Sequence, residues 1–302
     1  MQAEDILKNT IQRIDGAYAP STIRAYQADV AAFIQFCQSR QLESLPAQSI
    51  SICLFIEHLA EKRLSVASIR RAIAGISKIH QIHQFPDCIA HPDVKLTLRR
   101  VFRQRGCQSH QALGINYSMV KQLLPQNPSS LRELRDCALI LVAYDTLARR
   151  SELVTYEVND LLIKHLSQKT YYSLRIKKSK TDQLALGRVC PIRFETYQVL
   201  NKWLDQANIK EGFLLRGIRG KSHILDSLSR EQVNRIMKKL GREAGFPAET
   251  VKTMSGHSLR VGAAQDLLAS GASIAMIMHR GRWSKSDTVM RYLEQFSELE
   301  DL

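Results

Sequence analysis

The chain has 302 residues, a length that suits one large domain or two ordinary ones. It is 44% apolar and 24% charged, as globular proteins usually are, and it has no run of about eighteen apolar residues that could cross a membrane. The formal net charge is +14, from 43 Lys and Arg against 29 Asp and Glu. Such an excess favours a polyanionic partner, nucleic acid first, with an anionic membrane surface as the alternative.

The opening residues, MQAEDILKNT, carry acids and lack the apolar core of a signal peptide. The six cysteines are scattered and form no CxxC pair, which is typical of free thiols in a reducing compartment. We therefore expect a cytoplasmic protein with no membrane association.

Residues 1–105 predict an all-helical module. Between residues 20 and 40, Tyr26, Val30, Phe33 and Cys37 recur at steps of three and four residues, as on one face of an amphipathic helix. Similar patterns follow in AQSISICLFIEHLAEKR and SVASIRRAIAGISKIHQIHQ, and DVKLTLRRVFRQRG predicts a fourth helix that ends at Gly106. The polar, glycine-containing stretch 106–116 is expected to be a linker.

Residues 117–302 predict a mixed module. Short strands are expected within 160–191, and a capping box of Ser229 and Gln232 is expected to begin one of the helices. Helices are predicted at 117–125, 131–147, 194–207, 229–244, 257–270, near 274–280 and from 286. The fold class is thus mainly α with a small β-sheet, an all-helical first domain being followed by an α+β domain.

Four short motifs in this second module fit the chemistry of phosphodiester transfer. That reaction needs a nucleophile, cationic donors for the non-bridging oxygens and a proton for the leaving oxygen. Arginine suits the oxygens because its planar guanidinium donates two parallel hydrogen bonds and stays charged. The motifs are TLARRSEL (146–153), LRIKKSKT (174–181), GHSLRV (256–261) and GRWSKSDTVMRY (281–292). Each motif alone is weak, but their order and combination are specific.

With these motifs the sequence resembles the tyrosine site-specific recombinases, most closely the Cre-type members. TLARRSEL looks like the family's first arginine box, HSLRVGAA like its His-x-x-Arg box, and GRWSKSDTVMRY like its closing box. The helical pattern STIRAYQADVAAFIQFC also looks like the helices of the family's core-binding domain. The resemblance implies a SAM-like core-binding domain (1–105), a linker (106–116) and a catalytic domain (117–302) that form a C-shaped clamp on DNA.

The resemblance also implies a set of catalytic roles and no metal or cofactor. The implied residues are Tyr292 as the nucleophile of a 3′-phosphotyrosine bond, Arg149 and Arg260 on the non-bridging oxygens, His257 in proton transfer, Trp283 as an indole donor, Lys180 as the acid for the 5′-oxygen, and Glu152 as support for the arginines. Two alternatives stay open at this point: Arg150 could exchange roles with Arg149, and Lys178 could replace Lys180. His80, His83, Cys88 and His91 match no standard zinc spacing, so a metal is not expected there.

The resemblance places four candidate DNA-reading residues on groove-facing helices. These are Arg24 and Arg71 in the first module and Asn234 and Arg235 in the second. Arginine and asparagine suit the edges of guanine and adenine, although phosphate contact or plain solvation explains each residue equally well.

The expected partner is double-stranded DNA with inverted-repeat sites, bound by a homo-tetramer on two sites that forms from free monomers. The tail LEQFSELEDL, residues 293–302, is expected to dock on a neighbouring subunit. The alternative functions are a type IB topoisomerase-like relaxation of DNA and a catalytically silent DNA-binding protein. The target sequence and the biological task (plasmid dimer resolution, transposon cointegrate resolution or integration) do not follow from the sequence.

Overall fold

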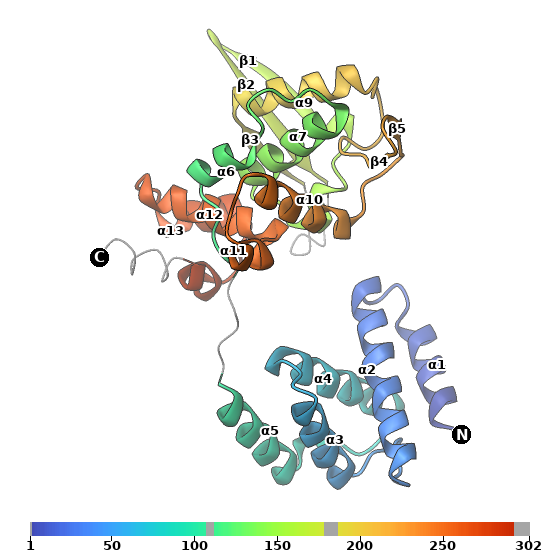
Figure 1. Ribbon diagram of the computed structural model, residues 1–302. Helices are drawn as coiled ribbons and strands as arrows, with labels where there is room; N and C mark the ends of the chain where they lie inside the picture. Colours follow the sequence, from blue (N-terminus) through green and yellow to red (C-terminus); the bar gives the residue numbers. More distant parts are fainter. Residues whose placement is uncertain (1, 107–111, 178–186, 293–302) are drawn as a thin grey trace. The chain divides into compact units, whose positions relative to one another are not determined.

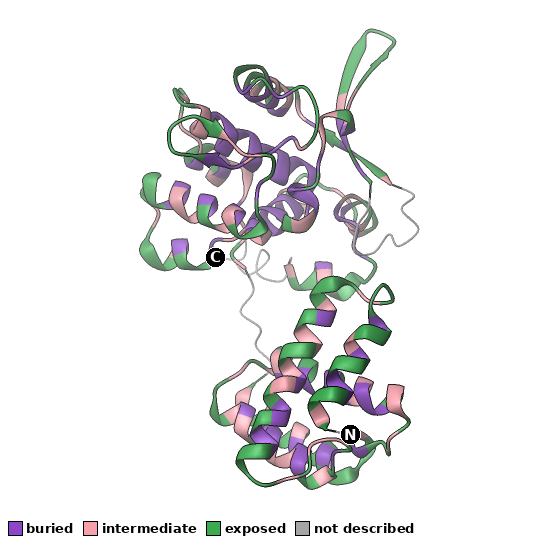
Figure 2. Cartoon of the chain, turned by 90° about the vertical axis from the view of Figure 1, so that its right-hand side faces the viewer, coloured by how far each residue is buried: buried purple, intermediate pink, exposed green. Residues whose placement is uncertain are grey.

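The computed structural model describes residues 2–106, 112–177 and 187–292, which Figure 1 shows as coloured ribbon. The chain divides into two compact units, Met1–Ser109 and His110–Leu302. Each unit has its own buried interior, with exposed residues on the outer faces of its helices (Figure 2). The predicted tail 293–302 and both lysine candidates, Lys178 and Lys180, lie outside the described residues.

The described part of the first unit is entirely helical, as predicted. Its elements are α1 (Ala3–Ile14), α2 (Pro20–Ser39), α3 (Ser49–Glu61), α4 (Val66–His83), the 3₁₀ turn η1 (Cys88–Ala90) and α5 (Pro92–Arg105). The four predicted helices correspond to α2 to α5, and α1 is an additional one. Helix α1 buries Ile6, Leu7 and Ile14, so it is held by the apolar stripe on one of its faces.

Among the histidines of the first unit, His80 is buried and hydrogen-bonded within the fold. His80 is only 2% exposed, and its two ring nitrogens face a hydrogen-bond donor and a hydrogen-bond acceptor, respectively. Nε2 accepts the backbone N–H of Ala47 at 3.1 Å, and Nδ1 lies 2.8 Å from the carbonyl of Pro86, to which it can donate. A neutral imidazole satisfies both contacts. Among the described residues, no group of three or more His, Cys, Asp or Glu side chains could hold a metal ion.

The second unit is mixed, with a small antiparallel sheet among helices (Figure 1). Its elements are α6 (Tyr117–Leu123), α7 (Leu131–Thr146), α8 (Arg150–Leu153), the 3₁₀ turn η2 (Val158–Asp160), β1 (Leu161–Leu166), β2 (Lys169–Ile176), β3 (Arg188–Ile192), α9 (Phe194–Gln206), β4 (Ile218–Arg219), β5 (His223–Ile224), α10 (Arg230–Glu243), α11 (Ala248–Thr253), α12 (Gly256–Ala269) and α13 (Ile274–Gly281). A last helical stretch begins at residue 286. The predicted strands and longer helices are confirmed, whereas α8, α11 and the β4–β5 hairpin were not predicted.

Helix α7 is the central helix of the second unit. A capping box of Ser130 and Glu133 begins it, and every residue from Leu134 to Thr146 is buried. It packs against α9, α12 and β3, which explains why its residues 137–144 form an uninterrupted apolar run. At α10, by contrast, Ser229 caps the helix by accepting the N–H of Gln232.

The three longer strands pair in the order β1-β2-β3, with Leu174 of β2 opposite Leu161 and Cys190. The chain from β3 leads directly into α9, which packs on α7. The sheet therefore stands beside the end of α7, where the first arginine motif begins.

The segment that enters the second unit lies along α12. The N–H of Ile115 donates to the carbonyl of Ser258 at 3.0 Å, and the N–H of Tyr117 donates to Asp266 Oδ2 at 2.7 Å. A Cβ at Gly262 would come within 1.9 Å of the Ile115 carbonyl oxygen. The last residues of the predicted linker thus rest on the helix that carries the His-x-x-Arg motif.

Within the described ranges, we find no helix with the length and apolar character needed to span a bilayer.

Candidate active site

A cavity of about 740 Å³ in the second unit brings the arginine, His-x-x-Arg and closing motifs together. It is lined by Arg149, Arg150, Ser151, Arg230, His257, Arg260, Trp283, Ser284, Lys285, Thr288 and Tyr292. These residues come from the starts of α8, α10 and α12 and from the chain after α13. Five of the predicted catalytic residues line this one cavity: Arg149, His257, Arg260, Trp283 and Tyr292.

The hydroxyl of Tyr292 lies 3.1 Å from Nε2 of His257. His257 stands in the first turn of α12, which Ser255 caps through its side chain. Burial lowers the pKa of His257, and the nearby charges of Arg260, Arg149 and Arg150 lower it further. The imidazole is therefore neutral at neutral pH and can accept the proton of the tyrosine hydroxyl.

Arg260 is 1% exposed and lies with its guanidinium 4.2 Å from the centre of the Trp283 ring. It donates to the carbonyls of Leu147, at 2.5 Å, and Gly281. Burial lowers the pKa of Arg260 to about 9, helped by the charges of Arg149 and Arg282. The group is still protonated at neutral pH. Two of its five N–H bonds are engaged in these carbonyl contacts, so donors remain for an anion in the cavity.

Glu152 binds Arg149 in two ways. Its carboxylate accepts from the Arg149 guanidinium at 2.7 Å and from the Arg149 backbone N–H at 2.9 Å. Although burial alone would raise the pKa of Glu152, the charge of Arg282 and the hydrogen bonds from Arg149 lower it below its usual value. Arg149 is partly exposed to the cavity, whereas Glu152 is almost fully buried.

Trp283 is packed between Arg260 and Tyr292, with 5.7 Å between the ring centres of Trp283 and Tyr292. Gly281 makes this position possible, because a Cβ there would lie 1.8 Å from the indole ring. A glycine two residues before Trp283 is thus a steric requirement of the site.

Some cavity residues were predicted only as alternatives, and others were not predicted from the sequence. Arg150 was named as an alternative to Arg149, and both line the cavity. Lys285 and Ser284 lie inside the closing motif, so their position in the chain could have indicated them. Arg230 carries no such signal, since it directly follows the cap of a helix far from the other motifs in the sequence.

The four predicted DNA-reading residues lie outside this cavity. Arg24 and Arg235 are exposed on α2 and α10. Arg71 forms a paired contact with Asp29, at 2.7 and 3.0 Å. Asn234 accepts the backbone N–H of Gly256 through Oδ1 at 3.0 Å, a contact that holds the start of α12.

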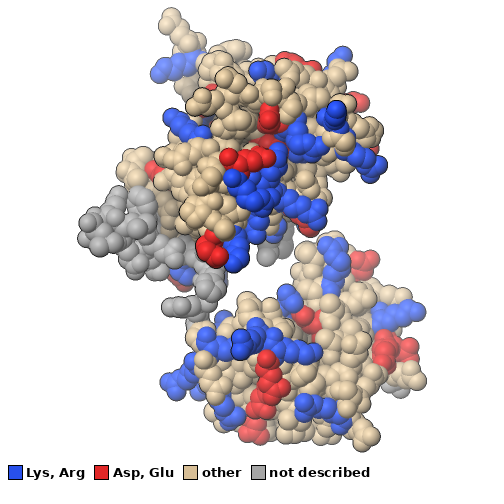
Figure 3. Space-filling model, viewed as in Figure 1, with Lys and Arg blue, Asp and Glu red and all other residues tan. Residues whose placement is uncertain are grey.

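Five basic residues line the cavity, namely Arg149, Arg150, Arg230, Arg260 and Lys285. Lys and Arg side chains gather over helix α10, whose sequence REQVNRIMKKLGRE supplies five of them (Figure 3). A cavity that combines a neutral histidine, a tyrosine and several arginines suits an anionic substrate such as a phosphodiester.

Comparison with known proteins gives matches over both units. The model of the phage integrase family matches residues 115–298, and that of the N-terminal SAM-like domain of phage integrases matches residues 12–84. An integrase/recombinase xerD homolog of Selenomonas ruminantium is 28% identical over 301 residues, covering 96% of this chain and 86% of its own. Recombinase cre of Escherichia phage P1 is 21% identical over 310 residues, covering 96% and 89%.

Solved structures agree on the fold. The XerH site-specific recombinase bound to palindromic difH substrate, a post-cleavage complex, matches with a TM-score of 0.68 and 16% identity. The match covers 92% of this chain and 78% of that one.

Proposed function

This chain belongs to the phage integrase family, and we propose that it is a site-specific DNA recombinase that cleaves and rejoins strands through a 3′-phosphotyrosine intermediate. The observation that carries the proposal is the 3.1 Å contact between the hydroxyl of Tyr292 and His257, in a cavity also lined by Arg149, Arg260 and Trp283. Both named relatives are recombinases, in agreement with this activity.

In the proposed reaction, Tyr292 Oη attacks a backbone phosphorus while His257 takes the hydroxyl proton. The Oη–P bond forms as the bond from phosphorus to the 5′-oxygen breaks, so the energy of the phosphodiester is kept in the phosphotyrosine. Arg149 and Arg260 stabilise the charge on the non-bridging oxygens, and the indole N–H of Trp283 adds a donor. We assign protonation of the 5′-oxygen to Lys180, which lies outside the described residues. Attack by the 5′-hydroxyl of another strand reverses these steps and completes the exchange.

We also propose that the two units have the separate roles that the family implies. Residues 1–105 would bind the core of the site and residues 117–302 would carry the chemistry, joined by 106–116 so that the chain closes around the duplex. A homo-tetramer on two inverted-repeat sites would exchange strands through a Holliday junction. The cytoplasm is the proposed compartment, because the substrate is DNA and the six scattered cysteines suit reducing conditions.

Nicked duplexes test the chemistry. The wild-type protein would first select its binding site from a random-sequence DNA library, and a nicked version of that site would then trap covalent protein–DNA adducts on a denaturing gel. Wild type should form the adduct, and Tyr292→Phe should bind the same DNA without forming any. An adduct with the phenylalanine variant would contradict the assignment of Tyr292.

Plasmids that carry two copies of the selected site test the activity. Recombinant products support a recombinase. Relaxation of supercoils without recombinants would indicate a topoisomerase, and a gel shift without cleavage would indicate a DNA-binding protein only.

A further inference from the structure

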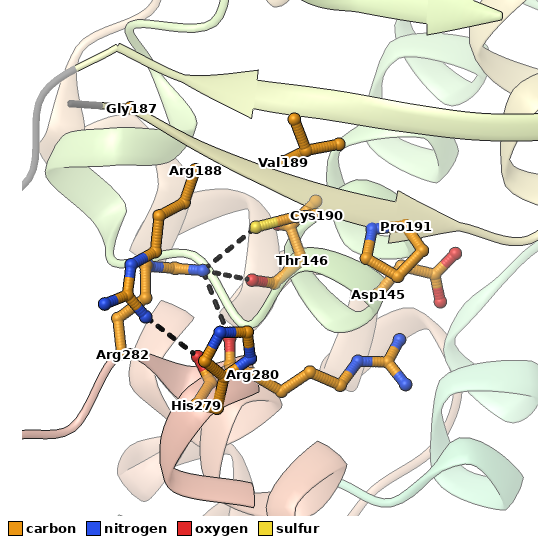
Figure 4. Close-up of a pocket in the computed structure, with 10 residues that line it drawn as sticks. All are labelled: Asp145, Thr146, Gly187, Arg188, Val189, Cys190, Pro191, His279, Arg280 and Arg282. Carbon is orange, nitrogen blue, oxygen red and sulfur yellow. Dashed lines mark hydrogen bonds between the residues drawn. The ribbon is translucent and has the colours of Figure 1, made fainter. Parts of the chain in front are cut away.

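Arg282 directly precedes Trp283 and is buried, with only 5% of its surface exposed. It lines a second hollow of about 570 Å³, beside β3 and the end of α13 (Figure 4). Neither its position in the sequence nor the family resemblance assigns it a role. Its contacts nevertheless reach into the catalytic cluster.

The guanidinium of Arg282 joins three parts of the second unit. Nη2 donates to Glu152 Oε2 at 2.9 Å and to the Leu147 carbonyl at 3.1 Å. Nη1 donates to the Thr146 carbonyl at 3.0 Å and lies 3.1 Å from Cys190 Sγ (Figure 4). Arg282 therefore ties the end of α7 to Glu152 in α8 and to strand β3.

Two of these acceptors also bind two of the cavity arginines, Arg149 and Arg260. Glu152 accepts from Arg149, and the Leu147 carbonyl accepts from Arg260. In addition, the backbone carbonyl of Arg282 accepts from Arg149 Nη2 at 3.4 Å. A displacement of Arg282 would thus be transmitted to both Arg149 and Arg260.

The backbone of Arg282 is in the left-handed region, with φ 57° and ψ 46°. Glycine adopts this conformation freely, whereas a residue with a Cβ is disfavoured there. The backbone therefore does not favour arginine at this position. The side-chain contacts offset this strain, and two of them, to Glu152 and the Leu147 carbonyl, involve groups that also bind cavity arginines.

The charges around Arg282 indicate that it holds other side chains in place and does not itself bind phosphate. Arg149, Arg260 and Arg282 surround a single carboxylate, that of Glu152. Arg282 is paired with that carboxylate while almost fully buried. Arg149 and Arg260, which line the cavity, keep donors available for a phosphate.

We propose, on the basis of the function proposed above, that Arg282 is a positioning residue that fixes Glu152 and the Leu147 carbonyl so that Arg149 and Arg260 face the phosphate.

The first test compares single-turnover adduct formation on the nicked site by wild type, Arg282→Gly and Arg280→Ala. Glycine fits the left-handed backbone, so Arg282→Gly removes the contacts without adding strain. We expect its cleavage rate to fall about ten- to a hundredfold, as for lost hydrogen bonds to a charged group, with half-site affinity unchanged. Arg280→Ala, a change of a neighbouring arginine in the same hollow, should cleave at the wild-type rate.

A double-mutant cycle separates positioning from simple stabilisation. If Arg282 acts through Glu152, Arg282→Gly should slow cleavage much less in a Glu152→Gln background than in the wild-type protein. Equal fold-losses in the two backgrounds would contradict the proposed path. Thermal unfolding of each variant shows whether the protein is folded at the assay temperature.

The outcomes distinguish the two proposals. If wild type forms no adduct, the proposed function is wrong and the role of Arg282 is lost with it. If wild type cleaves and folded Arg282→Gly cleaves equally fast, only the role of Arg282 is wrong. Should Arg282→Gly lack a cooperative unfolding transition, Arg282→Lys replaces it. Lysine has a single nitrogen where Arg282 uses both Nη1 and Nη2, so it loses the forked geometry; a slower rate supports the role and a wild-type rate overturns it.

Discussion

The side-chain amide of Gln265 donates a 3.0 Å hydrogen bond to the backbone carbonyl of Tyr292. Gln265 lies on α12, the helix that also carries His257. One helix therefore contacts Tyr292 twice, at its hydroxyl through His257 and at its backbone through Gln265. The orientation of the proposed nucleophile is consequently set by α12.

Replacing Gln265 by Leu should slow adduct formation while leaving DNA binding intact. Leucine has a similar volume but donates no hydrogen bond, so the Tyr292 backbone loses one restraint. The loss should be roughly two- to tenfold, the range for one net hydrogen bond. Single-turnover cleavage of the nicked site measures it, and a wild-type rate in Gln265→Leu would show that the contact is irrelevant to cleavage.

Adding a methyl group at Gly114 should disturb the same contact from the other side. A Cβ at residue 114 would lie 2.0 Å from Oε1 of Gln265, so Gly114→Ala must push that side chain away. We expect slower cleavage with unchanged half-site binding. In a Gln265→Ala background, where both the hydrogen bond and the collision are absent, Gly114→Ala should slow cleavage little further. Additive losses would count against a shared mechanism.

Gly281→Ala should destabilise the second unit. Its new Cβ would overlap the Trp283 ring, at 1.8 Å, and such overpacking generally costs about 1–3 kcal/mol. Thermal or denaturant unfolding measures the change. The cost should largely vanish in a Trp283→Ala background, and an equal cost in both backgrounds would mean that the ring is not the obstacle.

The pH profile of cleavage should reflect the lowered pKa of His257. Burial and neighbouring arginines disfavour the imidazolium, so the base form persists to a lower pH than the ordinary histidine value of 6.5. The cleavage rate should hold as pH falls to 6.5 and decline only below it. His257→Gln, which cannot take up the proton, should be slow and lack this acid limb. A wild-type rate that already halves well above pH 6.5 would contradict a neutral, buried base.

Binding to DNA should weaken steeply with salt, because each phosphate contact by Lys or Arg releases counterions. Six to ten contacts would lower the affinity about 10³–10⁵-fold between roughly 50 and 200 mM salt. Gel shifts or fluorescence anisotropy at several salt concentrations give the slope. A flat slope would be incompatible with a basic protein of net charge +14 that grips the duplex backbone.

The sequence predicts the helices, the sheet and most of the cavity because these follow from local patterns and residue chemistry. Val30 and Phe33 repeat at helical spacing, and His257 and Arg260 fall on one helix face whatever surrounds them. Tyr292 and Trp283 belong to a motif whose order along the chain is specific.

The remaining features depend on contacts between distant segments. Arg282 looks like a surface arginine until Glu152 and the Leu147 carbonyl are placed around it. Asn234 suits an adenine edge by its chemistry, yet its Oδ1 accepts the N–H of Gly256. Periodicity indicates which face of a helix is buried, but it does not indicate which residue from another segment lies there.

The contact of Ile115 with α12 has a mechanical consequence. The Ile115 N–H donates a hydrogen bond to the carbonyl of Ser258, the residue next to His257, and Gly262 permits this close approach because a Cβ there would collide with the Ile115 carbonyl. If the residues before Ile115 were pulled, the force would act on the Ser258 carbonyl, one residue from His257, the proposed base. A pull on the residues before Ile115 would thus reach, through covalent bonds and one hydrogen bond, the helix that contacts Tyr292 at its hydroxyl and its backbone.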